Sequence, residues 1–208
     1  TMTTEGRRGN MKYIIRLLSI FLVLFSTTSL QAKAPELTPQ LAKNKINEFL
    51  QAHIVHKSLS PELIAKTMEN FINELDPTRT YFINQEVAHW AQPDETLTLA
   101  IQHGIEKKDF SHFKEMYETM LTAIERRNKI EEKISEKALP AEVSHKEFID
   151  MPWVANEEEL SDRILRIRAL QTQAAERIDV EAKEMLLKRL ERNRLSYESD
   201  FIESTKEE

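Results

Sequence analysis

Glycine is almost absent from this chain after residue 32. Gly104 is the only glycine in the remaining sequence. Hairpin turns and phosphate-binding loops need glycine, because it adopts positive φ and lets other groups approach the backbone closely. The chain accordingly has no Asn-Gly or Asp-Gly hairpin turn and no glycine-rich nucleotide loop. A nucleophile of the Gly-x-Ser-x-Gly type is excluded for the same reason. The sequence predicts an all-α bundle of about six helices with no sheet.

Helix starts can be placed from cap residues followed by apolar residues at every third or fourth position. We expect helices to begin near Thr38, Ser60, Asn84, Asp94, Phe110 and Asn156, with a last helix over about Val180 to Ser196. The longest helix has apolar residues at alternating steps of three and four, which predicts a buried face. These residues are Phe110, Phe113, Tyr117, Met120 and Ile124.

Charge dominates the second half of that long helix, from Glu125 to Lys137. A run such as residues 125–129 is typical of a solvated face, supported by a Glu125–Lys129 pair one turn apart. A docking surface is the alternative, and we expect the far end to project into solvent or against a partner. In the last helix we expect three residues to be buried, namely Ala182, Leu186 and Leu190.

The N-terminal residues have the pattern of an export signal. Residues 1–10 precede Met11 and are interpreted as an upstream extension or a vector-derived remnant. Residues 11–32 combine a basic start, a compact apolar run and small residues before Ala32, which predicts a cleaved signal peptide and a periplasmic location. An uncleaved segment acting as a membrane anchor is the alternative, although the run is short for a bilayer span.

The remaining chain, residues 33–208, is acidic and contains no cysteine. Residues 1–32 hold four basic residues and one acidic residue, so 25 basic and 34 acidic residues remain without them. This balance disfavours nucleic acid and anionic lipid, both of which attract clustered cations. We therefore expect protein partners, no nucleic acid, and membrane contact only through the signal segment.

Two stretches resemble a known family. Residues 75–82 read Leu-Asp-Pro-Thr-Arg-Thr-Tyr-Phe, and residues 152–160 read Pro-Trp-Val-Ala-Asn-Glu-Glu-Glu-Leu. In the first, Pro77 should end a helix at Asp76, because the residue before a proline avoids helical backbone angles. In their order and wording the two stretches resemble the N-terminal helical domain of bacterial periplasmic tail-specific (carboxy-terminal processing) proteases, over about residues 59–196.

This resemblance implies that residues 33–208 form the helical domain that precedes the PDZ and protease domains. The family's Ser/Lys dyad lies downstream of the matched domain, so the resemblance assigns no catalytic residue to this chain. It implies a role in shaping substrate access, with contacts to unfolded or C-terminally tagged proteins, to the rest of the protease, and to an adaptor or a second copy. The other interpretation is a stand-alone periplasmic adaptor or holdase.

No residue is predicted to be a catalytic, cofactor or metal site. His53 and His56 are three residues apart on one helix face, but two ligands do not make a metal site without a third. Trp153 is the most informative loop residue. It either anchors its loop to the bundle or contacts another domain or subunit, because tryptophan is enriched at binding hot spots.

Overall fold

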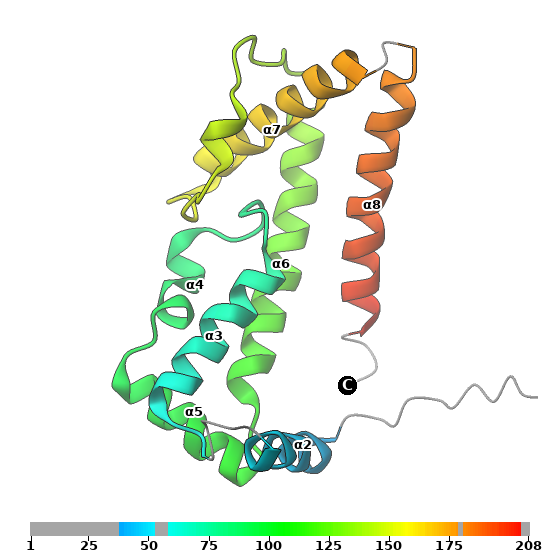
Figure 1. Ribbon diagram of the computed structural model, residues 1–208. Helices are drawn as coiled ribbons and strands as arrows, with labels where there is room; N and C mark the ends of the chain where they lie inside the picture. Colours follow the sequence, from blue (N-terminus) through cyan, green and yellow to red (C-terminus); the bar gives the residue numbers. More distant parts are fainter. Residues whose placement is uncertain (1–37, 53–57, 179–180, 205–208) are drawn as a thin grey trace, which may run out of the picture. The chain divides into compact units, whose positions relative to one another are not determined.

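A computed structural model describes residues 38–52, 58–178 and 181–204 of the chain (Figure 1). It divides into a unit from Thr1 to Leu37, which lies outside the described residues, and a unit from Thr38 to Glu208. The described residues contain seven α-helices and one 3-10 helix, η1. They are α2 (Pro39–Ala52), α3 (Pro61–Leu75), α4 (Asn84–Ala91), α5 (Glu95–Lys107), α6 (Ser111–Ile134), η1 (His145–Phe148), α7 (Glu157–Ile178) and α8 (Lys183–Ser204). The prediction of an all-α fold is confirmed.

Most of the predicted caps begin their helices as expected. Ser60 accepts a hydrogen bond from the backbone N–H of Leu63 at 3.2 Å, and Asp94 accepts one from Leu97 at 2.7 Å. Such side chains stabilise helix starts because the first backbone N–H groups have no partner within the helix. Thr38 and Asn156 likewise accept bonds from residues three positions ahead.

The prediction that Asn84 caps α4 is wrong, because Asn84 is already the first helical residue. Its backbone N–H donates to the carbonyl of Val154, on a different part of the chain, at 2.7 Å. The residue before it, Ile83, has its N–H bound by the carboxylate of Glu86 at 3.0 Å. The start of α4 is thus set by a tertiary contact that local sequence does not reveal.

The larger of two hydrophobic cores lies between α3, α4, α5 and the first half of α6. Its fully buried side chains include Met68, Phe82, Trp90 and Met120. Helix α2 contributes no buried residue, and Phe49 on it is 75% exposed. None of the helices described here is both long and apolar enough to cross a bilayer.

A second, smaller core lies at the far end of α6, where α7 packs against it. Ile130 and Ile134 of α6 are buried there together with Leu160 and Ile164 of α7. The expectation that this end of α6 projects outward is therefore wrong. Ile130 and Ile134 share the buried side of the helix with Arg127, while Glu125, Lys129, Glu132 and Lys133 on the other sides are exposed.

The last helix is longer than predicted and is buried elsewhere. Helix α8 ends at Ser204, and its buried residues are Glu198 and Phe201. Phe201 stacks on Tyr117 of α6 with ring centres 5.2 Å apart. Of the three residues predicted to be buried, Leu190 is 42% exposed, and Ala182 and Leu186 are only half-buried. The buried residues of α8 lie in its second half, and the helix also contacts α7.

The presence of glycine at position 104 has a steric explanation. A Cβ atom on Gly104 would lie 2.8 Å from the backbone oxygen of Asp109, which is too close for real atoms. The contact arises because the N–H of Asp109 bonds the carbonyl of Gly104 where α5 ends, at a left-handed Lys108. A backbone atom at this distance cannot move aside cheaply.

We expect Gly104→Ala to destabilise the protein by up to about 2 kcal/mol. Alanine favours helix over glycine by about 1 kcal/mol, but overpacking costs about 1–3 kcal/mol, and the clash should win. Urea denaturation measures the change. His103→Ala, at the exposed neighbouring position, should stay within about 0.5 kcal/mol. A gain in stability for Gly104→Ala would contradict the steric explanation.

Candidate functional site

The turn that follows α3, residues 76–82, is organised around one buried carboxylate, and we call this turn the corner. Pro77 ends the helix, and Asp76 leaves the helical region with φ −135° and ψ 69°, its side chain fully buried. The carboxylate accepts backbone hydrogen bonds from Thr80 at 2.9 Å and from Tyr81 and Phe82 at 3.1 Å each. It also accepts one from the indole nitrogen of Trp153 at 3.2 Å. A single side chain therefore fixes the turn and binds a residue 77 positions away.

Arg79 also contacts the corner, on the side where Trp153 lies. It has a positive φ of 53°, and its guanidinium donates to the carbonyl of Asp76 at 2.9 Å and to Asn73 at 2.5 Å. The guanidinium also lies 3.8 Å from the ring centre of Trp153, a cation–π contact. Burial lowers the pKa of Arg79, and the Asp76 carboxylate opposes this. Charge and aromatic packing thus hold Trp153 against the corner.

The loop before α7 is tied to the corner by backbone contacts as well. Arg163 of α7 donates to the carbonyl of Arg79 at 3.0 Å and to that of Pro152 at 2.9 Å. Val154 forms an isolated parallel bridge with Ile83. The two stretches singled out in the sequence are therefore in contact, and the observed contacts of Trp153 are those of an anchor for its loop.

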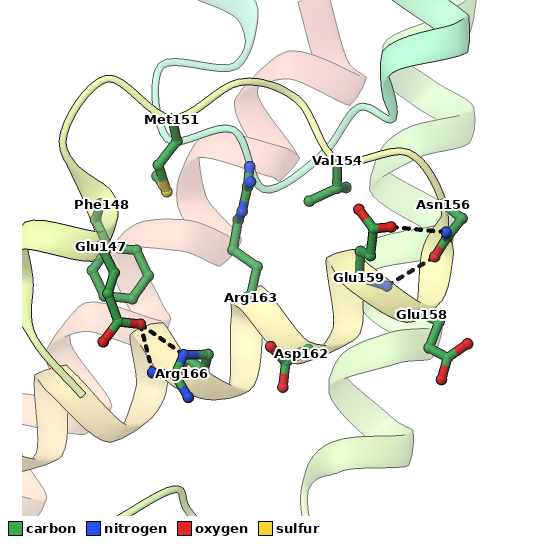
Figure 2. A pocket seen from close by; sticks show the side chains of 10 residues that line it. All are labelled: Glu147, Phe148, Met151, Val154, Asn156, Glu158, Glu159, Asp162, Arg163 and Arg166. Atoms are coloured by element: carbon green, nitrogen blue, oxygen red, sulfur yellow. Dashed lines mark hydrogen bonds and ion pairs between the residues drawn. The ribbon is translucent and has the colours of Figure 1, made fainter. Parts of the chain in front are cut away.

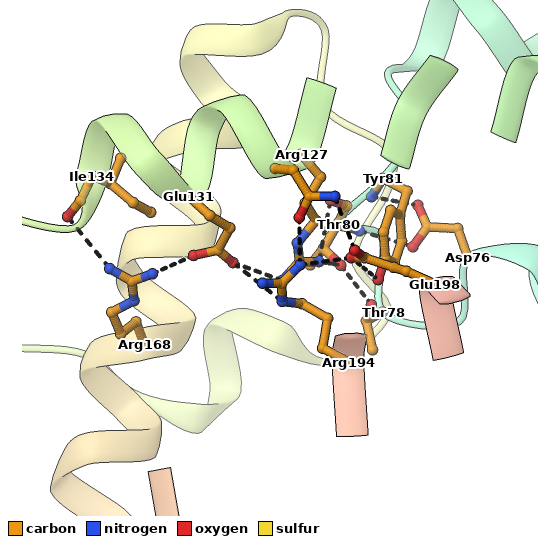
Figure 3. A network of polar contacts seen from close by, with 11 residues as sticks. Asp76, Thr78, Thr80, Tyr81, Arg127, Glu131, Ile134, Arg168, Arg194 and Glu198 are labelled. Atoms are coloured by element: carbon orange, nitrogen blue, oxygen red, sulfur yellow. Dashed lines mark hydrogen bonds and ion pairs between the residues drawn. The ribbon is translucent and has the colours of Figure 1, made fainter. Parts of the chain in front are cut away.

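The charged run on α6 supports this corner, and the prediction of a solvated face is wrong for its two arginines, of which Figure 3 shows Arg127. Arg127 is 9% exposed, donates to the carbonyl and hydroxyl of Thr80, and lies 4.8 Å from the ring centre of Tyr81. Arg126 donates to the carbonyl of Tyr81 at 2.7 Å and to Glu86 at 2.6 and 2.8 Å. The corner turns its carbonyls toward α6, and the arginines satisfy them.

Glu125 and Lys129 do remain exposed, but no ion pair joins them among the interactions found in the described residues. The sequence could not separate these residues from their buried neighbours, because all five positions of the run are polar. Which side chains of residues 125–129 are buried depends on where the corner packs against α6.

Glu198 connects α8 to this network, and the sequence did not predict its role. Its side chain is 3% exposed and accepts from the Tyr81 hydroxyl at 2.9 Å, from Asn128 at 3.0 Å and from Arg194 at 2.7 Å. Arg194 also donates to Asn128 at 2.9 Å. The local signal for this role is the Arg194–Glu198 spacing of one helical turn, which many exposed helices share.

The network continues toward α7 through Glu131 of α6. Its carboxylate receives Arg127 at 3.2 Å and Arg168 of α7, which also donates to the carbonyl of Ile134 at 3.4 Å. These partners come from α6 and α7, so one polar network reaches from the corner to both long C-terminal helices (Figure 3). Its contacts fix the arrangement of helices.

The Tyr81 phenol should make stability fall at alkaline pH. Burial raises the pKa of Tyr81 well above its usual value of 10.0, Arg127 opposes the rise, and Glu198 adds to it. Above pH 10 the unfolded chain loses this proton while the folded chain keeps it. The unfolded state then binds fewer protons, so the free energy of unfolding falls by up to about 1.4 kcal/mol per pH unit.

We expect Tyr81→Phe to remove that part of the pH dependence. The variant should be less stable than wild type at pH 8, because it lacks the bond to Glu198, and the difference should shrink from about pH 10 upward. Urea unfolding at pH 8, 9, 10 and 10.5 measures it. Parallel pH profiles for the two proteins would contradict a raised pKa for Tyr81.

A polar cavity of about 660 Å³ lies beside the anchored loop (Figure 2). Glu147 pairs with Arg166 across it at 2.5 Å, and the backbone N–H of Ser144 lowers the pKa of Glu147, with Arg166 adding to the effect. Phe148, Met151 and Val154 form the apolar part of its lining. Of its other charged residues, Arg163 donates to the backbone carbonyls of Arg79 and Pro152, and Glu159 accepts from Asn156 and from the backbone N–H of Ala155.

A second hollow, of about 240 Å³, is apolar and lies between α2, α3, α5 and the start of α6. Phe49, Leu50 and Phe113 are among its lining residues. Apolar surface of this kind can bind the apolar side chains of a protein but supplies no group for chemistry.

The histidine pair considered from the sequence, His53 and His56, lies outside the described residues. Among the residues that are described, no group of three or more acidic or histidine side chains is placed to hold a metal ion. Nor does any described lysine ammonium bond a serine hydroxyl, the contact that a Ser/Lys dyad would need. The contacts found among the described residues are those that hold a helical scaffold together.

Comparison with known proteins identifies the scaffold. A family model described as the tail specific protease N-terminal domain matches residues 45–207, which is more than three quarters of the chain. No curated protein and no solved structure matches the chain. The matched range includes both stretches that meet at Asp76 and Trp153. The chain belongs to the tail specific protease N-terminal domain family.

Proposed function

We propose that this chain is the non-catalytic N-terminal domain of an exported serine endopeptidase that processes or degrades proteins from their C-termini. In this role it shapes the access of substrates to a protease body and provides contacts for an adaptor or a second copy. The observation that carries the proposal is the union of the two family stretches at Asp76 and Trp153 within the matched range.

The buried hydrogen bonds of the domain support a rigid structural role. Asp76 receives four hydrogen bonds, and Glu198 receives three from α6, α8 and the corner. Buried carboxylates that each receive several hydrogen bonds from different elements hold helices in one arrangement, which an access-shaping domain requires. The polar cavity beside the loop and the apolar hollow next to α2 then remain available for binding. An exported, periplasmic location is supported by the signal pattern of residues 11–32.

Proteolysis by the native protein tests the proposal. Antibodies against this chain would capture the native protein from an envelope extract of the source cells. The captured protein is incubated with two forms of one unfolded reporter, one with a free C-terminus and one with its C-terminus fused to a stable folded domain. We expect cleavage of the first form only. The purified chain should cleave neither.

Controls define the contrary outcomes. A mock capture with pre-immune antibodies accounts for contaminating proteases. Captured protein that leaves both reporters intact would contradict the assignment to a protease. Cleavage by the purified chain, surviving repeated purification, would contradict a non-catalytic domain.

The apolar hollow favours a second candidate, a stand-alone periplasmic adaptor or holdase. It combines a largely apolar lining with Phe49, which is 75% exposed. A holdase should suppress the aggregation of an unfolding reporter at equimolar concentration, and Phe49→Ser should weaken that effect. Light scattering measures it, and unchanged aggregation would remove this candidate.

A further inference from the structure

The outward face of α8 carries an unusual stripe of cations and apolar residues. Met185, Lys188, Arg189, Arg192 and Leu195 are all exposed, with Met185 at 62% and Leu195 at 45%. Helical spacing places them within about a third of the circumference, along a line of about 15 Å. Ser196 and Ser199 continue the stripe up to Glu203, the first acidic residue on the same line. We call these seven residues the α8 stripe.

The opposite face of α8 is the one that holds it to the bundle. Arg194, Glu198 and Phe201 lie on that side and contact α6 and the corner. On the α8 stripe, Lys188 pairs only with Glu184 of its own helix, at 2.7 Å. Neither Arg189 nor Arg192 has a partner among the interactions found in the described residues. The stripe is therefore not used by the fold.

Its charge is opposite to that of the chain. The whole chain has a net charge of −6, yet residues 183–194 contain five basic and two acidic residues. Arginine and methionine are enriched in protein interfaces, and on the stripe the two arginines lie between two exposed apolar residues, Met185 and Leu195. A lipid surface fits less well, because the stripe has no aromatic residue and the chain's net negative charge is repelled by anionic lipid.

We propose that the α8 stripe is a docking surface for an acidic amphipathic α-helix of a partner protein. Carboxylates of that helix bind Arg189 and Arg192, and its apolar residues pack on Met185 and Leu195. The inference rests on the proposed function, since it specifies the chemistry of one protein contact of the domain. Complementary charge mainly accelerates association and selects the partner, and the apolar contacts add affinity.

A designed acidic helix tests the surface. The probe is a fluorescein-labelled peptide of three copies of Glu-Leu-Ala-Glu-Leu-Gln-Glu, and a second peptide has lysine in place of every glutamate. Binding to the full chain is measured by fluorescence anisotropy at 50 and 300 mM salt. We expect the acidic peptide to bind, more weakly at high salt, and the lysine peptide not to bind.

Variants locate the binding on α8. Arg189→Glu with Arg192→Glu should weaken binding at least tenfold, and Met185→Ser with Leu195→Ser about fivefold. The matched control reverses two exposed cations of α6, Lys129→Glu with Lys133→Glu, and should stay within twofold. All these positions are exposed, and circular dichroism verifies that each variant folds.

Several results would overturn the proposal. They are no binding of the acidic peptide at 1 mM, equal loss in the α6 control, and unchanged binding by the α8 double reversal. Binding to phosphatidylglycerol vesicles that depends on Arg189 and Arg192, without peptide binding, would assign the stripe to lipid instead. None of these experiments measures proteolysis, so a negative result for the α8 stripe is distinguishable from a negative result for the proposed function.

Discussion

Replacing Asp76 by asparagine or alanine is expected to destabilise the protein by at least about 3 kcal/mol. The carboxylate satisfies three backbone N–H groups and the Trp153 indole in a fully buried position. Each buried donor left without a partner costs about 1–3 kcal/mol. Asparagine retains one acceptor oxygen but turns an NH₂ group toward donors, so it should rescue little. Urea denaturation followed by circular dichroism measures the change.

Asp109 is the matched control for this prediction. It is an exposed aspartate that accepts one backbone hydrogen bond, from Ser111 at 3.0 Å, and this bond lowers its pKa. Asp109→Asn should cost much less than Asp76→Asn. Because Trp153 bonds Asp76 directly, its fluorescence should also shift in Asp76→Asn and not in Asp109→Asn. Equal effects of the two substitutions would show that Asp76 does not organise the corner.

Replacing Glu198 by alanine is expected to cost about 3 kcal/mol and to loosen α8. The change leaves the Tyr81 hydroxyl and Asn128 without the buried acceptor and removes the nearest carboxylate of the partly buried Arg194. Breaking a buried ion pair from one side costs about 3–5 kcal/mol, because the remaining charge is uncompensated. Glu198→Gln keeps an acceptor and should lose less. Unfolding in urea gives the free energy.

Hydrogen exchange distinguishes loosening of α8 from a general loss of stability. In Glu198→Ala, amides of α8 should exchange faster, beyond the change in global stability, while those of α3 should follow global stability. Glu203→Ala, at an exposed position of the same helix, should change stability by no more than about 0.5 kcal/mol. Uniform acceleration across all helices would show that Glu198 does not hold α8 locally.

Local signals in the sequence located much of the fold. Ser60 and Asp94 begin their helices because a side-chain oxygen next to a helix start finds free N–H groups wherever the helix lies. The apolar residues of α3 lie in the core as their spacing indicates, including Ile64, Met68 and Ile72. These features depend on neighbours in sequence, which is why the sequence is enough to find them.

The sequence misleads where partners are distant along the chain. Arg126 and Arg127 have the local pattern of solvated residues, although they bind the corner after α3, 40 or more positions earlier. Glu198 has no evident role until folding brings it to Tyr81, 117 positions away. A charged residue in a helix has the same local pattern whether its partner is water or a buried carbonyl.

The sequence by itself determined the helical class, most helix starts, and the two stretches that mark the family. It could do so because glycine scarcity, capping and apolar spacing act over a few residues. Only the tertiary structure decided that Asp76 binds Trp153, that α6 supports the corner with arginines, and that α8 is held through Glu198. These contacts depend on which backbone groups lack a partner after the helices pack, and that is a property of the folded chain.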